Sequence, residues 1–397
     1  MKKSTFLIIL FILAYGYLEY LPFIKINPDL NLVFQWLFLL YALVIYQKYS
    51  NNPLNISANK KYVSLFIVLM VISSLIPFYQ YNQSILSTLL AQRQNYNILF
   101  LFVLLYIHPS PRDFFVALRF CSFLCIVIMI LSIFFPEYFL SSEKFESFSM
   151  RVNRGSKDLV TASPGINLVF FYFLIKIESW FSSRSVKNFK EIVFIFIMII
   201  ILQNRSLLLI TIPIFIYSFI KLKSRYKFLS WIIFFIFFLL VSDYFLSIFN
   251  SLWEESISQF NNQDYNRWES LSFFILEPEF NFFQLIFGHG VPSQGGSYLD
   301  FIQTAQNNRN AYLSDIGLFG TFYLYGLAFI IPIYLFVFRA LKKQQPKFLK
   351  FLALYILLVP TIQRFGSLSS DAAIFYSMFF YLVIYYEKYN PDIKSFV

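Results

Sequence analysis

Arginine is the residue of this chain whose placement points most directly to chemistry. When the apolar stretches are laid across a bilayer with the N-terminus inside, most lysines fall in inner loops, whereas six arginines fall in outer loops. Inner lysines are the ordinary signal of membrane topology, so outer arginines need another reason. A guanidinium group donates paired hydrogen bonds to phosphate or carboxylate oxygens. The pattern predicts an anionic, pyrophosphate-bearing substrate at the outer face. The arginines are Arg151, Arg154, Arg205, Arg267, Arg309 and Arg364.

Arg93 is a further candidate because it lies inside an apolar stretch rather than in a loop. A charge at that depth is costly unless it faces the protein interior or a wet cavity. Gln92, Gln94, Asn95 and Asn97 surround it with polar groups. Two interpretations follow: a structural arginine that binds helix carbonyls, or an arginine that lines an anion-binding groove.

His289, between two glycines in FGHGVP (287–292), is a candidate general base because the ordinary pKa of histidine is near neutral. No neighbour in the sequence fixes its tautomer, so a buried or solvated histidine remains the alternative. Loop carboxylates are further candidate bases, although a lone loop carboxylate is usually a solvated charge. They are Asp264, Glu269, Asp300 and Asp315.

No spacing of cysteine and histidine in the sequence is typical of a metal site. The only other histidine is His108, and Cys121 and Cys125 share one face of an apolar segment, as small buried hydrophobic residues do. The sequence therefore predicts neither a metal nor a cofactor.

The composition excludes an ordinary soluble domain. Hydrophobic residues make up 58% of the 397 positions and charged residues 13%, about half the usual charged share. The net charge of +11 lies mostly in short loops between apolar stretches, where it sets topology and meets anionic lipid headgroups. It does not indicate nucleic-acid binding.

About 12 apolar stretches predict an all-α polytopic integral membrane protein with both termini inside. The inner connections 47–61, 177–190, 221–227 and 339–350 are all basic. The predicted spans are 5–22, 28–47, 62–79, 84–107, 113–136, 159–177, 189–204, 205–221, 228–249, 309–338, 347–363 and 369–387.

These spans divide the chain into three regions. Residues 1–249 carry the first nine helices, with an outer loop at 137–158; residues 250–308 form a large outer loop; residues 309–397 carry the last three helices. The large loop is rich in Asn, Gln, aromatic and acidic residues, the types that contact sugars. Within it, the segment 271–288 is interrupted by Glu277, Pro278 and Glu279, so we expect it at the membrane interface rather than across the membrane.

Several motifs resemble the conserved region of bacterial O-antigen polymerases and ligases. LIFGHGVP (285–292) is followed by NNRNAYLSDIGLFGTFYLYG (307–326), in which Asp315, Gly317, Gly320 and Gly326 match an acidic-x-Gly-x-x-Gly pattern and a second glycine. QNRSLLLI (203–210) is similar to the family's arginine at the outer start of a helix, and RVNRGSKDLVTASPGINL (151–168) to its Arg-Gly stretch before a proline. The resemblance covers residues from about 150 to 340.

The resemblance implies a GT-C-like membrane glycosyltransferase in the bacterial cytoplasmic membrane. Its reaction would transfer a glycan from undecaprenyl pyrophosphate to a hydroxyl of an incoming lipid-linked repeat unit, with inversion and without a metal. Arg205 and Arg267 would hold the pyrophosphate, with His289 as a speculative base. The other substrate-binding candidates are Arg93, Arg151, Arg154, Arg309, Asn310, Asp315 and Arg364.

The resemblance also bears on the partners and on the alternatives. The expected partners are the undecaprenyl-pyrophosphate-linked donor and acceptor, membrane lipids, a chain-length regulator and a flippase. Ligases of this group carry a histidine where this chain has Asn307 to Asn310, which favours a repeat-unit polymerase over a ligase. A flippase is a third alternative, but the candidate charges lie at outer helix ends rather than along a central path.

Overall fold

The computed structural model describes residues 2–20, 28–47, 56–93, 95–135, 165–183, 186–201, 205–220, 250, 254, 257, 266–293, 296–362 and 370–389. Every regular element among these residues is a helix, which confirms the all-helical prediction for this part of the chain. Three stretches among them are long and apolar enough to cross a membrane: Ser64–Tyr81, Pro111–Phe134 and Gly317–Ala340. The helices fall into two compact units, which are described separately.

Most predicted spans coincide with a helix. The matching helices are α1 (Lys3–Ala14), α2 (Pro28–Gln47), α3 (Ile56–Ser73) with α4 (Leu75–Tyr81), α7 (Pro111–Phe134), α10 (Ile166–Ser183), α11 (Val186–Ile201), α12 (Arg205–Ile220), α17 (Gly317–Ala340), α18 (Lys347–Ile362) and α19 (Ser370–Tyr389).

Three predicted spans differ from the helices of the structure, and two of these differ only at one end. The stretch 84–107 is not one helix but α5 (Ile85–Ala91), the 3-10 helix η2 (Asn95–Leu99) and α6 (Phe100–Ile107). The span predicted from residue 309 begins as α17 only at Gly317, after the 3-10 helix η4 (Leu313–Ile316). The first span ends in a separate 3-10 helix, η1 (Tyr17–Tyr20). The span 228–249 and the outer loop 137–158 lie outside the described residues.

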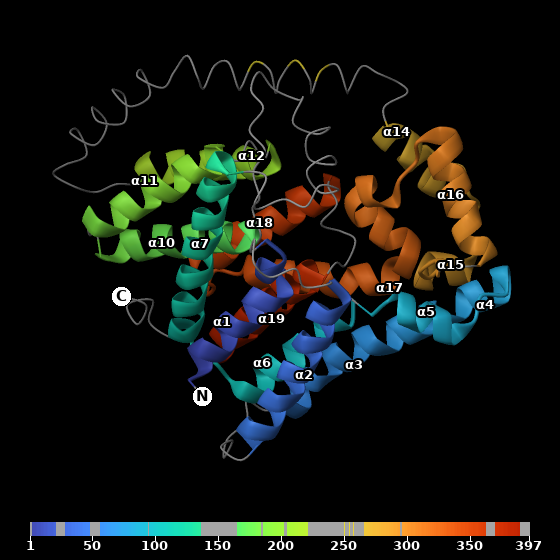
Figure 1. The fold of residues 1–397 in the computed structure, drawn as a ribbon, viewed down its shortest axis with the longest axis horizontal. Helices are drawn as coiled ribbons and strands as arrows, with labels where there is room; N and C mark the ends of the chain where they lie inside the picture. Colours follow the sequence, from blue (N-terminus) through green and yellow to red (C-terminus); the bar gives the residue numbers. More distant parts are fainter. Residues whose placement is uncertain are drawn as a thin grey trace. The chain divides into compact units, whose positions relative to one another are not determined.

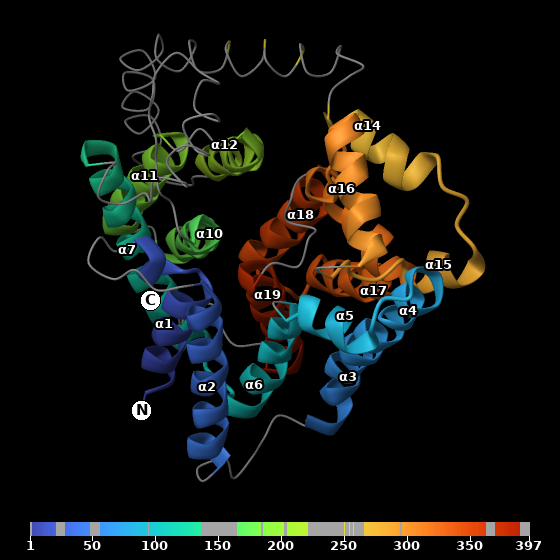
Figure 2. The same ribbon diagram turned by 45° about the vertical axis from the view of Figure 1, so that its right-hand side comes forward.

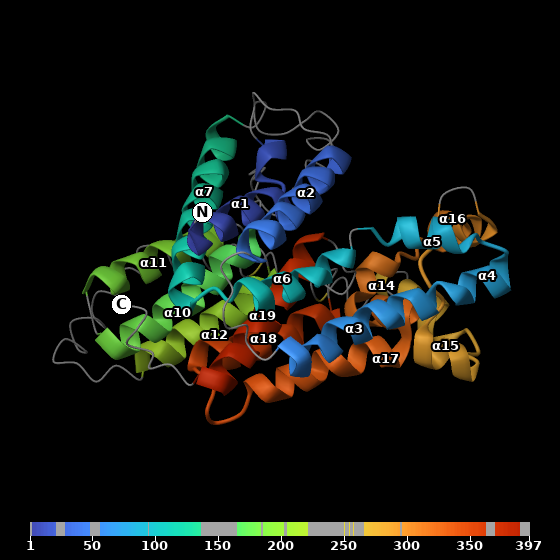
Figure 3. The ribbon, with the colours of Figure 1, turned by 90° about the horizontal axis from the view of Figure 1, so that it is seen from below.

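The first unit comprises residues 1–15, 27–117 and 263–395, and its core is aromatic. Phe66 on α3 stacks on Phe380 of α19, with ring centroids 5.9 Å apart, and meets Phe329 of α17 edge-on at 5.1 Å. Helix α6 packs against α19 (Figure 1). Figure 3 shows α3 and α17 side by side. These contacts bury the apolar faces that the hydropathy pattern predicted.

Part of the predicted large outer loop is folded rather than irregular. It contains α14 (Asn266–Leu271), the π-helix η3 (Ser272–Leu276), α15 (Phe282–Phe287) and α16 (Ser297–Arg309). We call residues 266–293 and 296–309 the outer lobe. Asn281 starts α15 with a capping box, in which its side chain and that of Gln284 each accept a hydrogen bond from the other's backbone N–H.

The outer lobe gathers beside α4 and the first half of α17 (Figure 2). Tyr81 of α4 stacks on Tyr298 of α16, with ring centroids 4.3 Å apart. The buried cluster that holds the lobe together consists of Phe274, Tyr298, Ile302, Ala305, Ala311, Ile316 and Tyr323. The lobe therefore has an apolar core shared with α17, as a folded region does.

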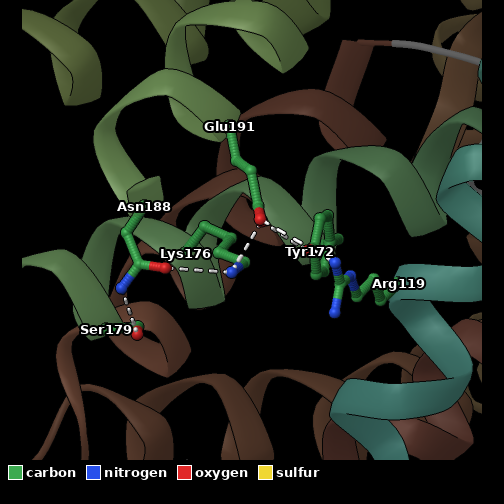
Figure 4. A network of polar contacts seen from close by, with 6 residues as sticks. All are labelled: Arg119, Tyr172, Lys176, Ser179, Asn188 and Glu191. Carbon is green, nitrogen blue, oxygen red and sulfur yellow. Dashed lines mark hydrogen bonds and ion pairs between the residues drawn. The ribbon is translucent and has the colours of Figure 1, made fainter. Parts of the chain in front are cut away.

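The second unit comprises residues 16–26, 118–262 and 396–397, and α10 and α11 pack together within it. Lys176 on α10 is 5% exposed, yet it carries a charge. Its Nζ lies 2.7 Å from Oε2 of Glu191 on α11 and donates to Oδ1 of Asn188 at 3.1 Å. The Tyr172 hydroxyl donates to Glu191 at 3.0 Å, and Arg119 approaches the same carboxylate at 3.9 Å (Figure 4).

This network joins α10 to α11 through an ion pair. A buried ion pair is not strong evidence of net stability, because desolvation opposes the attraction, but loss of one partner leaves the other uncompensated. The Asn188 amide extends the network to the Ser179 hydroxyl at 3.1 Å. We infer that the stability contributed by Lys176 depends on Glu191, and the reverse.

A double-variant experiment tests this pairing. Lys176→Met and Glu191→Leu are each expected to lower stability, whereas the double variant is more stable than the two single losses predict, with a coupling of about 1–3 kcal/mol. The measurement is thermal unfolding of the purified protein in one detergent. Lys190→Met is the control, because Lys190 is exposed on the same helix, and it is expected to change little. Additive losses would show that Lys176 and Glu191 do not depend on each other.

Candidate functional site

Two helical stretches of the first unit are interrupted, one near Arg93 and one in α17. The first break lies within the predicted span 84–107, at the polar cluster around Arg93. Helix α5 ends at Ala91 and η2 begins at Asn95. Gln92 is buried, and its Nε2 donates to the Ser74 hydroxyl at 3.2 Å. Asn97 is also buried and accepts a hydrogen bond from Gln35 at 3.0 Å. Irregular backbone at membrane depth is tolerated only inside protein or beside a cavity. At this break the Arg93 N–H donates to the Leu90 carbonyl at 3.1 Å, and the Asn95 N–H donates to the Gln92 carbonyl at 2.8 Å.

The second break lies in α17 at Gly326, whose φ of 70° and ψ of −176° are not helical. A Cβ at Gly326 would collide with the backbone of Ile286 and Phe287, and one at Gly288 would collide with the backbone of Leu324 and Tyr325. Gly288 also has a positive φ, 73°. Both positions require glycine, since two backbones meet there and the conformation is unfavourable for other residues.

The loop after α15 binds the carbonyl groups at this break. The backbone N–H of His289 donates to the Tyr323 carbonyl at 2.7 Å, and that of Gly290 donates to the Leu324 carbonyl at 2.9 Å. The Gly290 carbonyl in turn accepts from the Tyr298 hydroxyl at 3.1 Å. The two motifs GHG and YLYG, which are separate in the sequence, therefore form one continuous hydrogen-bonded structure.

The two breaks meet each other through side chains. Asn95 Nδ2 donates a hydrogen bond to the hydroxyl of Tyr325, a residue that is 1% exposed. Arg93, two residues before Asn95, has an exposed side chain. We call residues 92, 93, 95, 288–290 and 323–326 the paired breaks. They place one exposed arginine beside two irregular backbone segments within the first unit.

His289 lies at the centre of the paired breaks but is closely packed. Its ring stacks on Tyr323 at 4.2 Å and 8°, and Phe280 meets it edge-on at 5.2 Å. Its Nδ1 lies 3.3 Å from the Tyr323 carbonyl, which fits a tautomer with the proton on Nδ1. Burial lowers the pKa of His289 to about 4. The imidazole is therefore neutral at neutral pH and a weaker base than a general base tuned to that pH.

Arg309 and Asn310 end α16. Arg309 Nη1 lies 2.8 and 2.9 Å from the two carboxylate oxygens of Glu277, and its guanidinium lies over the Phe273 ring at 5.4 Å. Asn310 adopts a left-handed conformation, with φ 50°, as the C-cap. The Glu277 carboxylate occupies only Nη1 of Arg309, so a phosphate would bind the other N–H groups of the guanidinium or replace the carboxylate.

Arg267 lies half-buried on α14, beside the exposed ring of Trp268. The buried Ser270 hydroxyl, on the same helix, accepts from the backbone N–H of Tyr312 at 2.7 Å, which fixes α14 to the segment that leads into α17. Arg205 is the first residue of α12. Arg205 belongs to the second unit and Arg267 to the first, so their pairing around one pyrophosphate stays a prediction.

The remaining candidates are placed only in part. Asp315 lies in η4, at the outer start of α17, and its side chain is outside the description. Arg151, Arg154 and Arg364 lie outside the described residues, as does the loop carboxylate Asp264.

The sequence analysis missed the tyrosines that build the paired breaks. Tyr323 and Tyr325 lie in an apolar span, and Tyr81 and Tyr298 lie beside it. A buried hydroxyl usually needs a hydrogen-bond partner, so the motif YLYG was a signal that this span faces polar groups. The partner of Arg309, Glu277, was also missed, because 32 residues separate them.

Comparison with known proteins adds no assignment. No protein-family model, curated protein or solved structure matches the chain. Among the residues that the structure describes, no three side chains of His, Cys, Asp or Glu are grouped so that they could hold a metal ion. Function is therefore inferred from the arginines and from the paired breaks.

The glycine at the second break is testable by one added methyl group. Gly326→Ala is expected to destabilise the protein by more than about 2 kcal/mol, because it adds left-handed strain and a backbone collision. Thermal unfolding in detergent measures this. Gly296→Ala is the matched control, since Gly296 has φ −111° and its added Cβ would lie 3.5 Å from the nearest atom. Equal stability of both variants would show that α17 is not broken at Gly326.

The contact between the two breaks is testable by a double-mutant cycle. Tyr325→Phe removes the acceptor of Asn95 and is expected to cost about 1–3 kcal/mol, because a part-buried amide donor loses its partner. Asn95→Ala in the Tyr325→Phe background should cost much less than Asn95→Ala alone. The readout is again thermal unfolding. A coupling near zero would mean that the breaks do not contact each other through this hydrogen bond.

Proposed function

We propose that the chain is a polytopic glycosyltransferase of the bacterial cytoplasmic membrane that polymerises undecaprenyl-pyrophosphate-linked repeat units into a surface polysaccharide. In this proposal about 12 helices span the membrane, both termini are cytoplasmic, and the reaction takes place at the outer face. The feature of the sequence that supports the proposal most is the set of arginines in the predicted outer loops, where topology disfavours positive charge.

The paired breaks support the proposal from a second direction. Broken helices inside membrane proteins are typical of substrate sites, because they direct backbone and polar groups into a cavity. Here the GHG loop and the YLYG segment, which the family resemblance singled out, contact each other through backbone hydrogen bonds. Arg93 is exposed beside them. This arrangement explains why a polar cluster and a glycine motif occur in apolar spans.

The chemistry needs charge stabilisation more than acid catalysis. The bond between the anomeric carbon and the pyrophosphate oxygen breaks as a bond to the acceptor hydroxyl oxygen forms, and the hydroxyl proton leaves to a base. Pyrophosphate is a good leaving group, and arginines stabilise its growing charge. We assign that role to Arg205 and Arg267. The acceptor's base stays open, because the low pKa of His289 makes this residue a poor candidate.

The test is complementation of a deletion strain, read as a glycan size ladder with the lipid-linked intermediates extracted alongside. Deletion is expected to abolish the ladder and to leave single repeat units linked to undecaprenyl on the outer leaflet. Complementation with Arg205→Ala or Arg267→Ala should reduce polymer by about 10²–10³-fold, the range for loss of one transition-state contact. The amount of each variant in the membrane is measured by immunoblot.

Arg112→Ala is the matched control, since Arg112 is exposed in the first turn of α7 on the predicted inner side, and it should restore the full ladder. Three outcomes would contradict the proposal. Long lipid-linked chains that never reach their final acceptor would indicate a ligase, and repeat units trapped on the inner leaflet would indicate a flippase. Full-length polymer from both arginine variants would remove them from the reaction.

A further inference from the structure

The place where the GHG loop contacts α17 indicates how deep the loop lies in the membrane. In the predicted orientation, Arg339 marks the inner end of α17 and is the first residue of the basic connection 339–350. Gly326 lies about 13 residues earlier, or about 20 Å along a helix that rises 1.5 Å per residue. The backbone of Gly326 touches Ile286 and Phe287, so the end of α15 lies at the same level.

Helix α3 gives a second, independent measure. Lys61 is the last basic residue on its inner side, and Ser73 lies about 12 residues further, or about 18 Å. A Cβ at Gly290 would collide with the Ser73 carbonyl and Pro77. Two different helices therefore place residues 288–290 about 18–20 Å above the inner boundary.

The hydrocarbon core of a bilayer is about 30 Å thick, so these residues lie about 10 Å below its outer boundary. We propose that residues 280–293 form a re-entrant segment, which enters the outer half of the membrane and leaves on the same side, with acyl chains of the outer leaflet against α15. It does not merely rest at the interface.

Several backbone groups of this segment have partners within the protein, as such a depth requires, since lipid offers none. Besides the bonds from His289 and Gly290 to α17, the Gly288 N–H donates to the Gln284 carbonyl at 2.7 Å. The Val291 carbonyl accepts from Gln83 Nε2 at 2.9 Å, and the Ser293 N–H donates to Gln83 Oε1 at 3.0 Å. Protein groups thus replace the water that an exposed loop would bind.

The outward face of α15 fits acyl chains. Phe282 and Phe283 are 69% and 64% exposed, whereas Gln284 on the same helix is buried. Helix α15 packs on α17 and α3. α17 presents its own exposed apolar residues below this level, among them Leu327, Ile331 and Leu335. Helix α15 thus packs on a helix that is itself long and apolar enough to cross a membrane.

The chain is long enough to enter and leave. The exposed pair of Glu277 with Arg309 marks the water side, and α15, with six residues, spans about 9 Å. From Gly290 to Gly296 the chain can extend about 20 Å, which suffices to reach the start of α16. The segment therefore reaches a depth of about 10 Å without stretching.

Spin-label accessibility in nanodiscs of phosphatidylcholine and phosphatidylglycerol tests the proposal. Labels are placed at Phe282→Cys and Phe283→Cys in a Cys121→Ala, Cys125→Ala background. Collision with oxygen should exceed collision with a water-soluble nickel complex several-fold, as at Leu335→Cys on α17. Gln303→Cys, exposed on α16, should give the opposite ratio.

Two results of the accessibility measurement would overturn the proposal. A ratio like that of Gln303→Cys would put α15 in water, and low collision with both reagents would mean that a protein, such as a second copy of the chain, covers it. The unsubstituted protein gives a second readout: a phospholipid with a diazirine in mid-chain should crosslink to the peptide that contains Phe282 and Phe283, and absence of that adduct contradicts the proposal. The inference depends on the predicted orientation and not on the proposed reaction, so either can fail alone.

Discussion

The need to pair every backbone N–H and C=O in an apolar environment governs this structure. A continuous helix meets that need by itself, whereas each break frees donors and acceptors that protein must satisfy. At Gly326 the freed carbonyls are those of Tyr323 and Leu324, and the loop after α15 supplies their donors. The break in α17 and the position of the loop are therefore one feature, because neither satisfies its backbone groups without the other.

That constraint also explains the glycines. Gly288 and Gly326 each have a positive φ, and each lies against the backbone of the other's segment. Side chains at either position would separate the two strands of backbone and leave the carbonyls of α17 unpaired. Next to this contact, the ring of His289 stacks on that of Tyr323, with ring centroids 4.2 Å apart. The histidine thus has a structural reason to occupy this position even though burial makes it a weak base.

The sequence predicted the helices well because hydropathy measures the same burial that forms them. The bounds of α2 and α18, for instance, follow from apolar stretches between polar turns. The polar cluster around Arg93 indicated an unusual position but not a broken helix, since local composition does not reveal which distant groups are available. The pairs Asn95–Tyr325 and Arg309–Glu277 depend on tertiary contacts across 230 and 32 residues, and no local pattern encodes them.

The pair of Arg309 and Glu277 shows how a carboxylate can hold an arginine in position while the arginine stays accessible to a ligand. Both side chains are nearly half exposed, at 47% and 45%, and an exposed ion pair contributes only about 0–1 kcal/mol. A pyrophosphate offers more negative charge and several oxygens to the same guanidinium fork. Exchange of the carboxylate for such a ligand therefore costs little, while the carboxylate keeps the fork extended and oriented beforehand. A lysine at this position would keep its charge hydrated and would not be pre-oriented, which is a physical reason for arginine at residue 309.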